Sequence, residues 1–121
     1  KADAQASFGQ FISMGLHRTV TVADGVKLTF YNAGHILGSA FEALDIKEHA
    51  TGKQWRLVFS GDLGRKEIAI LRPPETLDST DILIMESTYG DRLHGPYQAA
   101  RKKLRLVVRS TVRRRGKVIT P

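Results

Sequence analysis

Alternation of apolar and polar positions dominates the first half of the chain and predicts β-strands. The alternating runs cover residues 18–23, 26–33, 39–49 and 54–60. Asp24 and Gly25 separate the first two runs, and this dipeptide favours the tight turn of a β-hairpin. Thr51 and Gly52 separate the other two runs in the same way. We therefore predict two antiparallel strand pairs, each with an apolar face.

A three- to four-residue spacing of apolar positions predicts a helix near each end. Residues 3–16 have this spacing roughly, with Gly15 as the stop, and residues 97–115 have it after Pro96 and before Gly116. Proline is favoured in the first turn of a helix, and glycine just beyond its end. The second predicted helix carries Lys and Arg on the face away from its apolar stripe, so it is basic and amphipathic.

The middle of the chain is predicted to be a long loop followed by a buried strand. Residues 61–80 are rich in Gly, Pro and charge, and a loop of that length in a compact domain is usually functional or disordered. Residues 81–87 form a nearly continuous apolar run, which favours a central buried strand. Residues 117–121 are expected to begin another strand after the basic helix.

The change from strands to a helix and a further strand near Gly90 predicts an α/β chain in two parts, residues 1–89 and 90–121. The whole chain has 121 residues, the length of one domain at most. It opens on Lys1 without an initiator methionine and stops in an apolar run at Pro121. We interpret both ends as cuts within a longer protein, called the parent protein below.

Composition narrows the possible functions. Cysteine is absent, which excludes a disulfide scaffold and leaves histidine and carboxylate as the available zinc ligands. No apolar run approaches the roughly 18 residues of a membrane span, so we expect no membrane-spanning segment. The formal net charge is +7, which suggests polyanionic partners but equally suits a protein that is merely basic and soluble.

Three loops carry the candidate chemistry, and each lies where a predicted strand ends. They contain AGHILGS, VFSGDLGR and ESTYGDRLH. Glycines around His35 permit close approach of another element, Asp62 follows a strand between glycines, and Glu86 ends a strand so apolar that its charge needs a partner. Taken singly, His35 has the alternative of a structural histidine. Asp62 has that of a turn residue bonded to its own backbone.

Together, in this order and spacing, the three motifs resemble the metallo-β-lactamase fold and, more narrowly, its β-CASP branch of RNA-processing nucleases. The resemblance covers nearly the whole chain. It implies part of an αββα sandwich followed by the first helix and strand of a β-CASP domain. It also implies that the parent protein is a metal-dependent hydrolase of RNA phosphodiester bonds, of the RNA-processing or 3′-end maturation type. The family and the basic composition favour RNA as the partner and the cytoplasm as the location.

The resemblance assigns roles to individual residues. His35 matches a metal-binding histidine, and Asp62 matches the carboxylate that bridges two zinc ions in such enzymes. Glu86 matches an acidic residue that orients a histidine supplied later in the chain, the expected general acid. His94 matches a position of the family pattern without an assigned role. Zinc accepts imidazole nitrogen and carboxylate oxygen at about 2.0–2.2 Å, so these residue types suit the expected chemistry.

The family also needs a His-x-His-x-Asp-His cluster, and this string does not occur in the chain. We interpret His17 and His49 as surface residues. A useful zinc site needs three or four protein ligands, and the chain supplies two candidates. We therefore expect the 121 residues alone to bind zinc weakly and to have no nuclease activity. We also expect them to be marginal as a folding unit, because the other half of the sandwich that should cover the sheet is absent.

Several basic residues are candidates for substrate contact. They are Arg65, Arg92 and His94 in loops and Lys102, Arg105 and Arg109 on the predicted basic helix. Contact with RNA phosphates would be independent of sequence and sensitive to salt. A solvated helix face explains the helical group at least as well.

Two other functions stay open at this point. One is a metallo-β-lactamase-fold hydrolase of a small ester, thioester or lactam, although ESTYGDRLH marks the β-CASP insertion. The other is a non-catalytic, RNA-binding pseudo-nuclease that keeps the fold without the chemistry. The presence of His35, Asp62 and Glu86 favours an enzyme.

Overall fold

The fold was analysed in a computed structural model that describes residues 2–66, 70–93 and 95–119. The chain forms two compact units, residues 1–86 and residues 87–121. We call them the sheet unit and the helical unit and describe each by itself. The predicted domain boundary at residues 89 and 90 stays a prediction. In the described ranges, no helix is both long and apolar enough to cross a bilayer.

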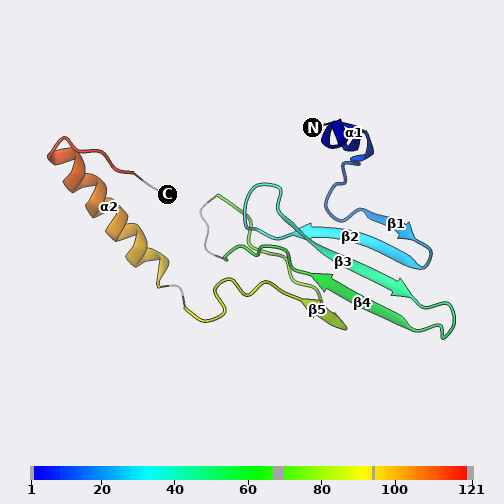
Figure 1. The fold of residues 1–121 in the computed structure, drawn as a ribbon. Coiled ribbons are helices and arrows are strands. Elements are labelled where there is room, and N and C mark those ends of the chain that lie inside the picture. Colours follow the sequence, from blue (N-terminus) through cyan, green and yellow to red (C-terminus); the bar gives the residue numbers. More distant parts are fainter. Residues whose placement is uncertain (1, 67–69, 94, 120–121) are drawn as a thin grey trace. The chain divides into compact units, whose positions relative to one another are not determined.

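The sheet unit is built on five strands in the order β1-β2-β3-β4-β5 (Figure 1). Their bounds are β1 Thr19–Ala23, β2 Val26–Asn32, β3 Ala40–Lys47, β4 Gln54–Phe59 and β5 Ile82–Ile84. The first four strands pair antiparallel with their neighbours, and β5 pairs parallel to β4. The predicted hairpins are therefore confirmed. Gly25, at the first turn, has the positive φ of 69° that such tight turns favour.

One face of the sheet holds the small core of the unit. Its buried residues are Ala33, Phe41, Ala43 and Val58. Tyr31 stacks on Phe41, with ring centroids 5.3 Å apart. Leu63 and Leu77, from the long segment between β4 and β5, pack against this cluster. The described residues of that segment contain no helix or strand, as predicted, and they cover this face.

The opposite face is apolar but lacks such a cover. Strand register aligns one row of side chains across the sheet, namely Val20, Leu28, Leu44, Leu57 and Ile82. Within the described residues no member of this row is fully buried, and none belongs to the core. Val20, Leu28, Leu44 and Leu57 are half-buried and Ile82 is exposed. Apolar surface left in water forgoes about 25 cal/mol per Å² of stabilisation. This exposure agrees with the expectation that the chain is part of a sandwich.

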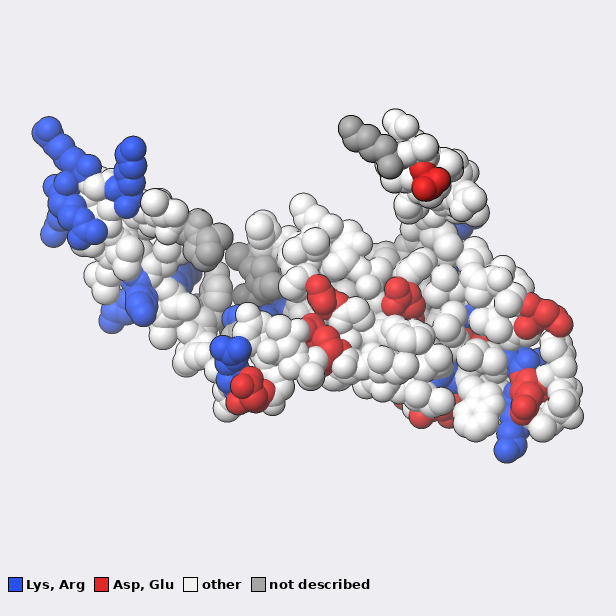
Figure 2. Space-filling model, in the orientation of Figure 1, with Lys and Arg blue, Asp and Glu red and all other residues white. Residues whose placement is uncertain are grey.

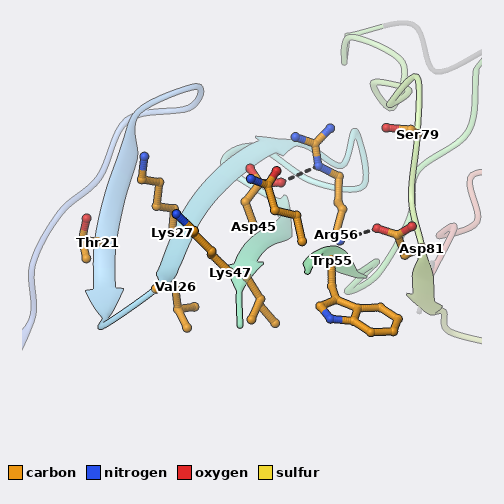
Figure 3. Close-up of a pocket in the computed structure, with 12 residues that line it drawn as sticks. Thr21, Val26, Lys27, Asp45, Lys47, Trp55, Arg56, Ser79 and Asp81 are labelled. Atoms are coloured by element: carbon orange, nitrogen blue, oxygen red, sulfur yellow. Dashed lines mark hydrogen bonds and ion pairs between the residues drawn. The ribbon is translucent and has the colours of Figure 1, made fainter. Parts of the chain in front are cut away.

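The covered face is polar near the end of β3 and the start of β4. Asp45 accepts a hydrogen bond of 2.7 Å from the Nε of Arg56, which raises the pKa of the guanidinium (Figure 3). The backbone N–H of Arg56 donates to Asp81, whose own N–H donates to the Arg56 carbonyl. These bonds fix the chain just before β5. Trp55 points to the other side of the sheet (Figure 3).

Three sequence predictions need correction. The first helix is much shorter than residues 3–16: α1 spans Ala2–Ser7, η1 spans Phe8–Gln10, and the chain is extended from Phe11. Its apolar side chains are exposed and lack the packing that stabilises most helices. Strand β5 is at the edge of the described sheet, and all three residues are exposed, so it is neither central nor buried. Residues 117–119 form no strand, since a strand needs a hydrogen-bonding partner.

The helical unit contains α2, Tyr97–Arg113, directly after Pro96 as predicted. Gly116 takes part in the C-terminal cap, as predicted, but the residue with the left-handed conformation is the preceding arginine. Arg115 adopts the left-handed φ of 55°, its N–H bonds the Val112 carbonyl, and the Gly116 N–H bonds the Thr111 carbonyl. This double bond pattern is a Schellman motif with arginine where glycine is usual.

Candidate metal centre

The three candidate residues His35, Asp62 and Glu86 lie at the same end of the sheet. Because β2, β4 and β5 run in the same direction, their C-terminal ends lie at the same edge. His35 follows β2, Asp62 follows β4 and Glu86 follows β5. Residues separated by more than twenty positions in the sequence are thereby brought to one site.

His35 and Asp62 face each other across this edge. The Nε2 of His35 lies 3.9 Å from the Oδ2 of Asp62. Their side chains are 45% and 74% exposed, so both are open to solvent. At this separation the direct electrostatic interaction between the two side chains is weak. It leaves both polar atoms accessible to a shared ligand.

Two glycines let the His35 and Asp62 loops approach each other. The Gly64 N–H donates to the Ala33 carbonyl at 2.8 Å. A Cβ atom at Gly64 would lie only 1.7 Å from the Gly34 carbonyl oxygen, so no other residue fits without moving the backbone. Gly34 itself has a φ of 64° and packs against the backbone of Arg72. The glycines of the motifs are therefore contact points between loops.

Serine and asparagine side chains fasten the His35 loop from within. The Ser39 hydroxyl accepts hydrogen bonds from the N–H groups of His35 and Ile36, at 2.9 and 3.2 Å. The Asn32 side chain donates to the Pro73 carbonyl at 2.9 Å and accepts from the Gly34 N–H at 3.2 Å. The loop that carries the imidazole is thus held to its own turn and to the long segment after β4.

A second tie holds the long segment at the same edge. The Glu75 N–H donates to the Asn32 carbonyl, and its carboxylate lies 2.8 Å from the Nε2 of His17. His17 has a left-handed φ of 62°, which is uncommon for a residue other than glycine. Its side chain is exposed, as the surface interpretation predicts, but it makes this definite contact.

Glu86 contacts the Asp62 loop directly. Its Oε1 accepts a hydrogen bond of 2.6 Å from the Leu63 N–H, and its own N–H donates to the Ser60 hydroxyl at 3.0 Å. The sequence-based prediction that this carboxylate has a partner is confirmed. It did not reveal that one partner lies in the neighbouring motif.

The donor set fits part of a zinc site. The gap of 3.9 Å between His35 and Asp62 is shorter than two zinc–ligand bonds of about 2.0–2.2 Å, so one ion can reach both atoms. The described residues contain no group of three or more His, Cys, Asp or Glu side chains that could hold a metal. The pair therefore suits zinc by type and spacing but falls short of a complete site.

Comparison with known proteins identifies the family. No family model matches the chain. It is 37% identical over 98% of its length to the endoribonuclease YSH1 of Eremothecium gossypii, and 33% identical over 94% to the ribonuclease TTHA0252 of Thermus thermophilus. It is 36% identical over 98% to the cleavage and polyadenylation specificity factor subunit 3-I of Arabidopsis thaliana. The chain belongs to the β-CASP family of the metallo-β-lactamase fold.

The β-CASP chain spans only a small part of these relatives, namely 15%, 23% and 16% of their lengths. The resemblance predicted from the three motifs is confirmed, and the mixed α/β structure agrees with a partial metallo-β-lactamase and β-CASP segment. The roles of single residues stay predictions.

The substrate-contact candidates are divided between the two units. Arg65 belongs to the Asp62 loop. Arg92 places its guanidinium 5.1 Å from the ring centre of Tyr89 and lies 3.5 Å from Asp91. His94 lies outside the described residues. The predicted helical group, Lys102, Arg105 and Arg109, lines one shallow groove along α2.

Sequence reasoning missed the residues that support the candidate ligands. Ser39, Ser60 and Asn32 make the bonds that hold the loops. Each stands within five residues of a candidate ligand and beside glycine, alanine or phenylalanine. A serine or asparagine in or beside a motif is the signal that could have pointed to them.

Proposed function

We propose that the parent protein is a zinc-dependent β-CASP ribonuclease that hydrolyses RNA phosphodiester bonds. The observation that carries the proposal is the approach of His35 and Asp62 to 3.9 Å, at the end of the sheet where β5 leads into Glu86. The names of relatives that match almost the whole chain, which include endoribonuclease and ribonuclease, support RNA as the substrate.

In this proposal His35 and Asp62 would hold zinc, and Asp62 would be the ligand that two ions share. Zinc held there would supply a water with a pKa lowered toward 7 and would stabilise the charge that develops on the phosphate. The chain's own contribution is to hold an imidazole nitrogen and a carboxylate oxygen at a solvent-exposed edge. Glu86 holds the Asp62 loop and also orients a histidine that lies outside these 121 residues.

The 121-residue chain alone is proposed to be inactive and to bind zinc weakly. A tetrahedral zinc site needs four ligands, of which three are protein side chains in catalytic sites. The described part of the chain offers the pair and no larger cluster of candidate ligands. The remaining ligands are proposed to come from other segments of the parent protein.

The basic helix is proposed to contact the RNA backbone. Lys102, Arg105 and Arg109 are exposed and recur at steps of three and four, so they share one face of α2. Figure 2 shows basic side chains gathered over this element. Phosphate contacts of this kind do not depend on base sequence and weaken as salt rises. This surface favours an extended polyanion over a small ester or lactam as the substrate.

Cleavage of labelled RNA by the purified parent protein tests the proposed function. We expect cleavage with zinc, loss of cleavage with a strong chelator, and a loss of at least about a hundredfold in kcat in Asp62→Ala. Ser7→Ala serves as the control, since Ser7 lies in α1 and its hydroxyl bonds the carbonyl of Ala4. A wild-type parent protein that leaves RNA intact in the presence of zinc would overturn the proposal.

A further inference from the structure

A short arch of the backbone carries Asp62, and both of its ends are tied to Glu86. The arch runs from Ser60 to Leu63. At its start, the Ser60 hydroxyl accepts the Glu86 N–H at 3.0 Å. At its end, the Leu63 N–H donates to the Glu86 carboxylate at 2.6 Å. Asp62 lies between these two attachment points.

Ser60 is built into this arch more firmly than a turn residue would be. It is only 4% exposed, and its N–H donates to the Ile84 carbonyl, which continues the β4–β5 ladder. Its hydroxyl also donates to the Gly61 carbonyl at 2.7 Å. One buried hydroxyl therefore bonds two backbone groups: it donates to the Gly61 carbonyl and accepts from the Glu86 N–H. The second of these bonds joins the end of β4 to the chain just after β5.

The Asp62 side chain has little else to fix its position. It is 74% exposed, so packing places it only weakly, and its contact with His35 is 3.9 Å long. Under these conditions the direction of the carboxylate depends on the backbone that carries it. The two ties to Glu86 supply that constraint.

We propose that Ser60 is a positioning residue for Asp62, acting through the backbone of Gly61 and Glu86 rather than by touching metal or substrate. This inference rests on the proposed function, because it concerns the aim of a metal ligand. Groups that orient metal ligands typically change metal affinity by 10- to 100-fold when they are removed. The structure thus assigns to a buried hydroxyl the kind of support usually sought around the ligating histidines.

The test compares Ser60→Ala, Ser60→Thr and Ser60→Val in the parent protein, with Ser7→Ala as the control. Threonine keeps the hydroxyl, whereas valine has nearly the same shape without it. Zinc affinity is measured with zinc alone, by competition with a coloured chelator, and the ligand field is followed in the cobalt-substituted protein. Hydrogen exchange of the Glu86 N–H is measured in parallel on the metal-free protein.

We expect Ser60→Ala and Ser60→Val to weaken zinc binding at least tenfold, to shift the cobalt spectrum and to speed exchange at the Glu86 N–H. Ser60→Thr and Ser7→Ala should stay within about threefold of wild type. Equal zinc affinity in Thr and Val variants would overturn the inference. Unfolding of both Ala and Val variants would also overturn it, since the hydroxyl would then serve the sheet.

The same measurements separate this inference from the proposed function. A wild-type parent protein that binds no zinc and cleaves no RNA removes the proposed function whatever the variants do. A wild-type protein that binds zinc and cleaves RNA, with a fully competent Ser60→Val, removes only the role of Ser60.

Discussion

The two units of the chain differ sharply in charge and in what they hold. The helical unit, residues 87–121, has ten Lys or Arg and one acidic residue, a net charge of +9. The sheet unit has nine basic and eleven acidic residues, a net charge of −2, and the two values together restore the +7 of the whole chain. His35, Asp62 and Glu86 all belong to the sheet unit. The net charge of the whole chain therefore reflects the helical unit and gives no information about the site in the sheet unit.

The units also differ in what holds them together. The sheet unit is fastened by backbone ladders and by loop-to-loop bonds around Gly34 and Gly64. The described part of the helical unit is organised around a single helix, α2, whose apolar stripe is largely exposed. Such a helix depends on its own backbone bonds and caps in this chain. Substitutions in the sheet unit should therefore change the geometry of its loops. Substitutions in the helical unit should change its charge or the stability of the ends of α2.

The largest effect is expected from Gly64→Ala, which inserts a Cβ 1.7 Å from the Gly34 carbonyl oxygen. The backbone must move, which we expect to cost about 3 kcal/mol of the free energy of unfolding of the sheet unit. Denaturant unfolding of the chain, followed by Trp55 fluorescence, measures it. Gly9→Ala is the matched control, because nothing lies within 4 Å of the added atom. Equal unfolding midpoints for the two variants would refute the loop contact.

The next largest effect is expected when positive charge is removed from the helical unit, compared with the same removal from the sheet unit. Replacing Lys102, Arg105 and Arg109 together with Gln should flatten the slope of log affinity against log salt by about 2 for single-stranded RNA. The control replaces Lys27, Lys47 and Lys53 of the sheet unit, which removes the same charge. Binding titrations of the parent protein at several salt concentrations measure both slopes. Equal slopes in the two triple variants would mean that RNA responds to net charge alone.

A smaller effect is expected from Ser39→Ala. The variant removes the acceptor for the His35 and Ile36 N–H groups, so hydrogen exchange at both should accelerate while β3 and β4 stay protected. The expected loss is about 1 kcal/mol, the usual net contribution of one such bond. Amide exchange in the 121-residue chain measures it. Unchanged exchange at His35 would show that the turn holds without the hydroxyl.

The smallest effect, and a gain, is expected from Arg115→Gly. Arg115 holds a left-handed conformation that costs a residue other than glycine roughly 1 kcal/mol. Glycine should therefore raise the helix content and thermal stability of α2 slightly, as seen by circular dichroism. Arg114→Gly, which removes the same charge at a φ of −91°, should not. A loss of helix in Arg115→Gly would refute the cap assignment.

The sequence predicted strands, turns and motifs well where the signal was local. Alternation located β1 to β4, and Asp24-Gly25 located the first turn, because both depend on near neighbours. The family motifs identified His35, Asp62 and Glu86 as a group. Their spatial meeting followed from the common direction of β2, β4 and β5, which alternation alone does not give.

The failures share one physical cause, which is missing cover. Apolar periodicity over residues 3–16 and apolar continuity over 81–87 predict burial, but burial needs a second surface. In the described part of the chain that surface is lacking, so α1 is short and β5 is exposed. The hydrogen bonds by which Ser39 and Ser60 hold the loops were not predicted for another reason. The Ser60 hydroxyl accepts from Glu86 in another loop, and the Ser39 hydroxyl accepts within its own turn, whose backbone conformation the residue pattern does not give.

The central claim is that His35 and Asp62 of this chain are ligands of one zinc centre in the parent protein. Native mass spectrometry of the zinc-loaded parent protein tests it most directly, by counting bound ions in wild type, His35→Ala, Asp62→Ala and the control Ser7→Ala. The account predicts two zinc ions in wild type and the control, and fewer than two in each ligand variant. Two zinc ions retained in Asp62→Ala, at unchanged resistance to a chelator, would contradict it.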